Sequence, residues 1–215
     1  MRILKEIYNK LLKHFGQQHW WPGESQLEII IGAILTQNTN WLNVEKAIKN
    51  LKQANLLSIN ALDKMEVDKI AQFIKPAGYY NIKAKRLKNF INWLSKEYNA
   101  DITQLESKST DDLREELLGI NGIGMETADS IVLYAFNKLS FVVDAYTYSI
   151  FSRHNLIPEE TDYYEIKSFF EDNLTDDCNL FNEYHALIVR LGKECCKKTK
   201  PLCEKCPLNG INNYP

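Results

Sequence analysis

The chain has 215 residues, of which 45% are hydrophobic and 25% are charged, and its formal net charge is −2 at pH 7. This composition is typical of a soluble globular protein that is long enough for one core or two small lobes. No apolar run reaches the roughly 18 residues that a membrane-spanning helix needs. The charge disfavours a protein that binds nucleic acid over a broadly positive surface, but it allows phosphate contacts through backbone N–H groups and a local basic patch.

Apolar residues recur at helical spacing along most of the chain, beginning with residues 1–15. That first segment lacks the apolar core of a signal peptide, so we expect a cytoplasmic protein. The later helices expected from the spacing are 27–36, 41–53, 66–74, 82–97, 111–118, 125–136, 144–154, 162–173 and 180–195. Phe141 to Val143 is too short to indicate a sheet and is expected to be an extended connector. The sequence thus predicts an all-α protein.

The most informative helix junction lies between residues 111–118 and 125–136. The residues between them predict a helix end, a tight Gly-x-Gly turn at Gly122 and Gly124, and a new helix from Met125. The first N–H groups of a helix lack intrahelical partners and lie at the positive end of its dipole. Gly122, Gly124 and Met125 are therefore candidate contacts to a DNA phosphate.

Basic residues gather in and just before the segment 82–97. They are Lys75, Lys83, Lys85, Arg86 and Lys88. Such a run is either an ordinary solvated helix face or a positive patch that meets phosphates. We include Lys83 among the candidate DNA-binding residues on the second interpretation.

Four of the five cysteines lie between residues 195 and 206. Disulfides of secreted domains are spread along the chain, so this crowding does not indicate a disulfide framework. Thiolates at this density suit an iron–sulfur cluster or zinc. The sequence predicts a metal site at the C-terminal end.

Several motifs, in this order along the chain, resemble those of the helix-hairpin-helix DNA glycosylases of the endonuclease III superfamily. The hairpin Leu118–Ala128 (LGINGIGMETA) followed by Val143-Asp144 carries the resemblance. It is supported by Gly32–Thr39 (GAILTQNT) and by Gly78–Ala84 (GYYNIKA). Together the matches run from residue 20 almost to the end of the chain.

The resemblance implies two helical lobes with a DNA-binding cleft between them. Residues 27–139 are expected to form a helical barrel that carries the helix-hairpin-helix at 111–136. Residues 1–26 and 140–215 are expected to form a second helical domain with a cysteine loop at 195–212.

The resemblance also implies roles for three single residues. Asp144 would act at the sugar C1′, where a carboxylate stabilises the positive charge that develops as the glycosidic bond breaks and orients the attacking water. Taken alone, Asp144 could equally be a plain helix N-cap. Gln37 would fill the gap left by a flipped nucleotide, and Tyr79 would wedge beside the opposite base.

A lysine of the strand-cleaving members is missing. Those members carry it in the second helix of the hairpin, where this chain has Glu126. A Schiff base needs an amine nucleophile, which glutamate does not supply. We therefore expect a monofunctional glycosylase without efficient lyase activity.

Three of the four tryptophans lie near the motifs just described. Trp20, Trp21 and Pro22, together with Trp41, resemble the base pocket of the 3-methyladenine DNA glycosylase III branch. Aromatic walls hold a flipped base by stacking, and they suit the cationic alkylated purines in particular. The alternative is that these tryptophans pack inside the core, as we expect for Trp93.

The cysteine spacing matches the family's [4Fe–4S] loop only in part. Cys196, Cys203 and Cys206 correspond to the first three ligands, but the fourth position is Asn212. Cys195 is a possible fourth ligand, although adjacent side chains rarely reach one cluster, and Cys178 is a more remote candidate. A [4Fe–4S] cluster with an unusual ligand, a labile or three-iron cluster, and a degenerate site all stay open.

The sequence therefore predicts a base excision repair enzyme that hydrolyses the glycosidic bond of alkylated purines, chiefly 3-methyladenine, in double-stranded DNA. We expect it to act as a monomer. One alternative is an endonuclease III-like glycosylase and lyase that acts on oxidised or mismatched pyrimidines. Others are a non-catalytic protein that binds DNA structures and, more weakly, a zinc-stapled interaction module.

Overall fold

The computed structural model describes residues 2–20 and 23–211. Every regular element in these ranges is helical, and the ranges contain no strand. None of the described helices is both long enough and apolar enough to cross a membrane. The chain divides into two compact units, Met1–Trp20 with Leu139–Pro215, and Trp21–Lys138.

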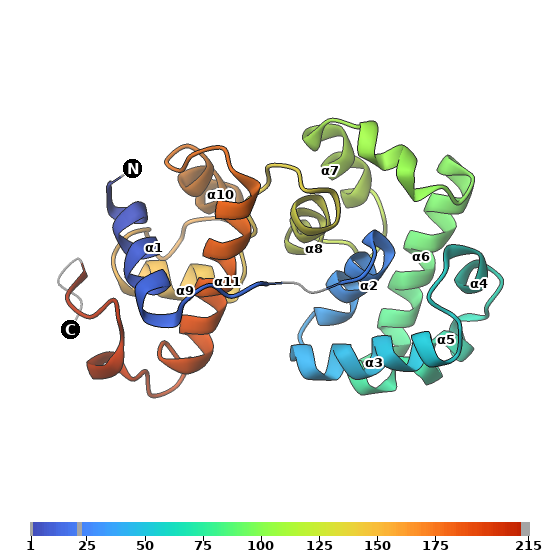
Figure 1. The fold of residues 1–215 in the computed structure, drawn as a ribbon, viewed down its shortest axis with the longest axis horizontal. Coiled ribbons are helices and arrows are strands. Elements are labelled where there is room, and N and C mark those ends of the chain that lie inside the picture. The colour runs from blue at the N-terminus through green and yellow to red at the C-terminus, as the bar shows by residue number, and fades with distance from the viewer. Residues whose placement is uncertain (1, 21–22, 212–215) are drawn as a thin grey trace. The chain divides into compact units, whose positions relative to one another are not determined.

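The unit Trp21–Lys138 is built around one apolar helix. Its helices are α2 (Gln26–Thr36), α3 (Trp41–Gln53), α4 (Ile59–Asp63), α5 (Val67–Phe73), α6 (Tyr80–Tyr98), α7 (Thr110–Leu118) and α8 (Met125–Ser130) (Figure 1). Short 3₁₀ turns, η1 (Lys75–Ala77) and η2 (Ile102–Ser107), precede α6 and α7. The helix α2 is buried over most of its length, because its sequence is apolar on nearly every side. It contacts α3, α6, α8 and the segment 131–135 that follows α8, so these elements pack around it.

The second hairpin helix changes its winding. α8 continues directly into the π-helical segment η3 (Ile131–Ala135), whose five residues are all buried. The sequence predicts one helix over 125–136, so the extent is as expected but the winding is not. π-helical turns occur mostly as short insertions within α-helices.

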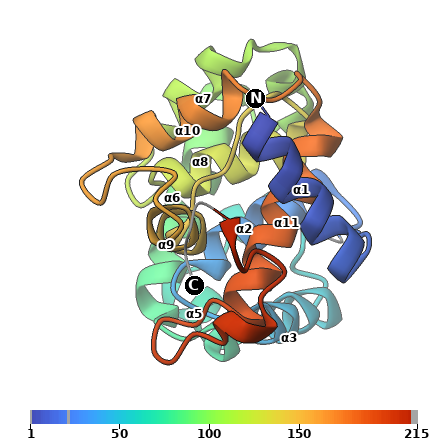
Figure 2. The same cartoon turned by 90° about the vertical axis from the view of Figure 1, so that its left-hand side faces the viewer.

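The other unit is arranged around a long helix near the C-terminus. Its elements are α1 (Arg2–Phe15), α9 (Ala145–Arg153), α10 (Tyr163–Glu171), α11 (Cys178–Glu194) and the 3₁₀ turn η4 (Cys203–Lys205). α11 packs against both α1 and α9, as the two views show (Figures 1 and 2). The approach to α9 is close, because a Cβ on Gly192 would overlap the ring of Tyr146.

Aromatic side chains form much of the core of this unit. Phe141 stacks on Phe170 with the ring centroids 3.9 Å apart, and Phe181 and Tyr184 of α11 meet Phe141 edge-on. The hydroxyl of the buried Tyr184 donates to the carbonyl of Leu4, which ties α1 to α11. Phe141 therefore anchors the connector that leads to Asp144. Residues 141–143 have no regular secondary structure, and the backbone of Asp144 itself is extended.

Candidate active site and DNA-contact segments

Asp144 is the N-cap of α9. Its Oδ1 accepts the backbone N–H of Thr147 at 2.7 Å and the hydroxyl of Thr147 at 2.9 Å. Asp144 is therefore a helix cap, which was the alternative interpretation of this residue. The cap uses one oxygen only, and the side chain keeps 11% of its surface exposed.

The second oxygen of Asp144 faces α11. Its Oδ2 lies 3.7 Å from Nε2 of His185, a side chain that is only 6% exposed. Burial by itself raises the pKa of the Asp144 carboxyl, but the interactions with His185 and Thr147 outweigh it and hold this pKa below its usual value. Asp144 is therefore an oriented carboxylate at neutral pH, as stabilisation of a positive sugar requires.

Trp20 lies beside this pair. Its ring meets the ring of His185 edge-on, with the centroids 6.4 Å apart. The ammonium of Lys193, two turns further along α11, lies 5.6 Å from the centre of the Trp20 ring. A cation in this position interacts favourably with an indole ring. The proposed pocket residues Trp21 and Pro22 lie outside the described residues.

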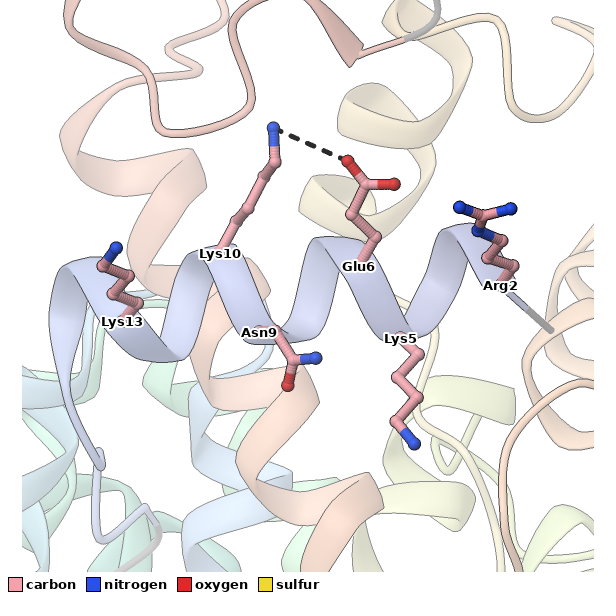
Figure 3. A pocket seen from close by; sticks show the side chains of 6 residues that line it. All are labelled: Arg2, Lys5, Glu6, Asn9, Lys10 and Lys13. Carbon is pink, nitrogen blue, oxygen red and sulfur yellow. Dashed lines mark ion pairs between the residues drawn. The ribbon is translucent and has the colours of Figure 1, made fainter.

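Two hollows open on the surface of the same unit. One, of about 590 Å³, has Trp20 in its wall together with polar side chains such as Asn179, Asn182 and Glu183. The other follows α1, where Arg2, Lys5, Lys10 and Lys13 project from the helix and Lys10 pairs with Glu6 (Figure 3). Asp144 is not among the described residues that line either hollow.

In the unit Trp21–Lys138, the hairpin is braced by an ion pair. Arg114 of α7 donates to both oxygens of Asp129, at 2.7 and 3.1 Å, and Asp129 is fully buried. This bidentate geometry is the strong form of an arginine–carboxylate contact. It fixes α7 relative to the segment that starts at Met125.

The turn between the hairpin helices rests on α6. Gly122 has φ +99°, a conformation that favours glycine, and a Cβ there would overlap the side chain of Arg86. Gly124 has open space where its Cβ would be and is exposed, as is Glu126 in the first turn of α8. The turn therefore presents Gly124 and Met125 at a helix start, which is the arrangement that can receive a phosphate.

Gln37 follows the last residue of α2 and contacts the hairpin. Its Nε2 donates to the carbonyl of Gly122 at 3.1 Å and to the hydroxyl of Thr127 at 2.8 Å, while its Oε1 accepts from Arg86. Gln37 and Gly122 are therefore brought together. Gln37 would have to break its hydrogen bonds with the hairpin and Arg86 before its side chain could enter DNA.

Tyr79 projects from a turn with unusual backbone angles. Gly78 has φ +65° and Tyr79 has φ +45°, and the Tyr79 side chain is 73% exposed. Left-handed conformations at residues other than glycine cost energy and are concentrated at functional positions. An exposed aromatic ring on such a turn has the form that a wedge into DNA requires.

The structure corrects the expectation for Lys83. The residue is only 1% exposed, and its ammonium donates to the carbonyls of Leu35 and Ala77. Lys83 therefore does not belong to a surface patch that meets phosphates. The periodicity of α6 explains its burial, because Lys83 shares a face with Leu87, Phe90 and Leu94.

Trp41 lies at the start of α3, where it packs partly against the core. Its indole N–H donates to Glu45 one turn later, at 2.7 Å. Trp41 and Trp20 belong to different units of the chain. The assignment of both to one base pocket stays a prediction.

The cysteine loop has the donor chemistry of a metal site but not its arrangement. The thiol of Cys196 receives a hydrogen bond from Arg153 at 3.3 Å, and burial raises the pKa of Cys206 to about 11. Among the described residues, no three His, Cys, Asp or Glu side chains are gathered closely enough to hold a metal ion. Cys196, Cys203 and Cys206 are therefore not gathered into a ligand set in this structure, and Asn212 lies outside the described residues.

The same arginine also fixes the backbone of the loop. Arg153 donates to the carbonyls of Cys196, Lys197 and Lys198, at 3.3, 2.9 and 3.0 Å. Cys195, the possible fourth ligand, is buried with its sulfur 4.0 Å from the carbonyl of Lys205.

Comparison with known proteins decides the family. Residues 31–175, which include the hairpin and Asp144, match the family described as HhH-GPD superfamily base excision DNA repair protein. The chain belongs to this superfamily. The all-α class and the resemblance to endonuclease III superfamily glycosylases, both predicted from the sequence, are confirmed.

Two relatives align with nearly the whole chain. A protein of Methanocaldococcus jannaschii described as a candidate DNA repair glycosylase is 50% identical over 207 residues, which cover 96% of this chain and 94% of that protein. Endonuclease III of Thermotoga maritima is 27% identical over 208 residues, which cover 95% and 89%.

The chain is also similar to solved structures. The H. pylori 3-methyladenine DNA glycosylase bound to 1,N6-ethenoadenine is 32% identical, with a TM-score of 0.77, and the match covers 90% of this chain and 96% of that one. A complex of endonuclease III with DNA has a TM-score of 0.84 at 20% identity, covering 99% and 95%, and shows the same fold.

Sequence reasoning missed the residues that orient those it selected. Arg86, His185 and Lys193 contact Gln37, Asp144 and Trp20 respectively. His185 lies on the buried face of α11 and from the sequence alone looks like a core residue. The sequence places Arg86 in a run of basic residues, and only its contacts with Gly122 and Gln37 distinguish it from the lysines of that run.

Proposed function

We propose that this base excision DNA glycosylase is monofunctional and releases alkylated purines, chiefly 3-methyladenine, from double-stranded DNA. The observation that carries the proposal is the Asp144 carboxylate, which is held ionised between Thr147 and His185. The 32% identity to the H. pylori 3-methyladenine DNA glycosylase supports the choice of substrate.

The arrangement suggests how the residues divide the reaction. One oxygen of Asp144 is fixed by the α9 cap, so the carboxylate direction is set before DNA binds. As the bond between base and sugar breaks, positive charge develops on the sugar, and a nearby carboxylate lowers the barrier by stabilising it. The other carboxylate oxygen of Asp144, Oδ2, faces His185 and can accept a proton from the attacking water.

An alkylated purine places few further demands on the protein. It carries a positive charge and leaves without a strong general acid, so one carboxylate can suffice. Its cationic ring gains from contact with the π-system of tryptophan, which Trp20 can provide. The ammonium of Lys193 lies over the Trp20 ring, and a bound cationic base would compete with this ammonium for the ring face.

The chemistry of Glu126 supports release of the base without strand cleavage. Glu126 is exposed in the first turn of α8 and has no nucleophilic amine. The reaction then ends at an abasic site. Borohydride reduction tests this directly, because a Schiff base would be trapped as a covalent protein–DNA adduct.

The deciding experiment measures base release from methylated duplex DNA, with each product resolved, beside duplexes with thymine glycol and a G·T mismatch. Release of 3-methyladenine without a borohydride adduct supports the proposal. Release from the pyrimidine substrates supports the alternative of an endonuclease III-like enzyme. The Thermotoga maritima relative is described as endonuclease III. Tight binding to abasic DNA without release of any base supports a non-catalytic DNA-binding protein.

The iron–sulfur cluster stays a prediction from the cysteine spacing and from the likeness to endonuclease III. Cys196, Cys203 and Cys206 would supply three thiolates, and Cys195 is the candidate for the fourth. Iron and acid-labile sulfide in the purified protein test for the cluster. Cys195→Ser tests the fourth ligand, with Cys178→Ser as the control because Cys178 lies at the other end of α11.

A further inference from the structure

Lys83 joins two loops that are distant in sequence. Its Nζ donates to the carbonyl of Leu35 at 2.8 Å and to the carbonyl of Ala77 at 2.7 Å. Leu35 lies near the C-terminal end of α2, and Ala77 is the last residue of η1. Gln37 lies two residues after Leu35, and Tyr79 lies two residues after Ala77.

A buried ammonium is held only where its hydrogen bonds offset the loss of water. Burial, with the nearby Arg86 guanidinium, lowers the pKa of Lys83 to about 8, so the group is still mostly protonated at neutral pH. Charge-assisted hydrogen bonds are shorter and stronger than those between neutral groups. Loss of the ammonium would leave two buried carbonyls unsatisfied, at the ends of the two loops it joins.

Each of the two loops also has contacts of its own. Gln37 is fixed on its other side by the hairpin, through Gly122 and Thr127. Tyr79 directly precedes α6 as its N-cap residue, and its carbonyl accepts the backbone N–H of Lys83 at 3.1 Å. Lys83 therefore contacts the Tyr79 turn through both its backbone and its side chain.

We propose that Lys83 is a positioning residue that sets the separation of Gln37 and Tyr79, and through it the depth to which the two side chains enter the DNA stack. The proposal rests on the proposed function, in which Gln37 fills the gap left by the flipped nucleotide and Tyr79 wedges beside its partner. Lys83 itself touches no DNA. A change in this separation would lower the fraction of bound DNA that has the target base flipped.

The test compares Lys83→Met with Lys138→Met. Lys138 is a matched control in the same unit, because its ammonium also bridges two backbone carbonyls, those of Glu106 at 2.9 Å and Lys108 at 2.7 Å. Three quantities are measured well below each melting temperature. They are the dissociation constant for a duplex with a stable abasic analogue, the fluorescence of 2-aminopurine opposite that analogue, and the single-turnover rate of base release.

We expect Lys83→Met to reduce the 2-aminopurine signal and to slow base release about tenfold, since small displacements of positioned groups have effects of this size or larger. Lys138→Met should lose stability but leave the fluorescence and the rate unchanged. In a Gln37→Ala/Tyr79→Ala background, Lys83→Met should slow release by less than about twofold, because coupled residues are not additive.

Equal behaviour of the two lysine variants, or full additivity in the double-alanine background, would overturn the proposal. If Lys83→Met does not fold, Lys83→Arg replaces it, since arginine keeps the charge but cannot place one nitrogen between the two carbonyls. The binding and fluorescence readouts need no glycosidic chemistry. A wild-type protein that distorts abasic DNA but releases no base therefore refutes the proposed function alone.

Discussion

Nε2 of His185 lies 3.7 Å from Oδ2 of Asp144, and this contact lowers the pKa of a carboxyl that burial alone would raise. A carboxyl whose folded pKa is depressed stabilises the fold above the unfolded pKa of about 3.9, and this contribution is lost as the pH falls through the folded value. The same ionised form is the one that supports catalysis.

His185→Leu should therefore move the acid limb of base release to higher pH, by about one unit, because an opposite charge or donor near a carboxylate is lost. The rate of single-turnover release between about pH 3 and pH 7 measures this shift, because the acid limb of a carboxyl with a lowered pKa lies at the acid end of that range. His14→Leu, at an exposed position of α1, is the control. An acid limb that stays in place in His185→Leu contradicts the role given to this contact.

Asp144→Asn should slow base release by about 10³-fold while DNA binding is retained, since asparagine lacks the negative charge. Asparagine caps helices about as well as aspartate, so the fold should be preserved. Asp162→Asn, which alters the N-cap of α10 in the same unit, is the matched control and should release bases normally. Turnover by Asp144→Asn at the wild-type rate would end the catalytic assignment.

Trp20→Ala should slow the release of 3-methyladenine roughly tenfold or more, because stacking on an aromatic side chain is worth about 1–3 kcal/mol per base. Trp93→Ala removes a tryptophan whose ring packs against Phe90 and Tyr98 in the other unit. It should lower the melting temperature without a selective loss of alkylated substrates. If Trp20→Ala loses only stability, Trp20 is a core residue.

Gly122→Ala and Gly124→Ala separate the two tasks of the hairpin turn. At Gly122 a Cβ meets Arg86 and the backbone has φ +99°, so we expect a loss of about 1–3 kcal/mol in the free energy of unfolding. At Gly124 the space is open, and stability should hardly change. Both variants should bind abasic duplex more weakly, and tight binding by Gly124→Ala would show that no phosphate lies there.

Most of the longer helices could be predicted from the sequence because their apolar residues recur at helical spacing. The expected segment 41–53 coincides with α3, and 27–36 differs from α2 by one residue. The five-residue helix α4 was not expected, since it is too short to show a period. The roles of single polar residues are harder to predict, because they depend on which neighbours the fold supplies.

Lys83 shows what could have been predicted from the sequence and what could not. Its neighbours in sequence, Lys85 and Arg86, made it look like part of a basic surface. Its spacing to Leu87 and Phe90 places it on the buried stripe of α6, which could have been read from the sequence. The two carbonyls that accept its hydrogen bonds could not be predicted from the sequence, because they belong to segments that only the tertiary structure brings together.

The guanidinium of Arg153 binds three successive carbonyls and one thiol of the cysteine loop. These contacts come from a single side chain at the end of α9, so one residue fixes the path of the backbone at 196–198. Replacement of Arg153 would release this stretch from α9 in one step.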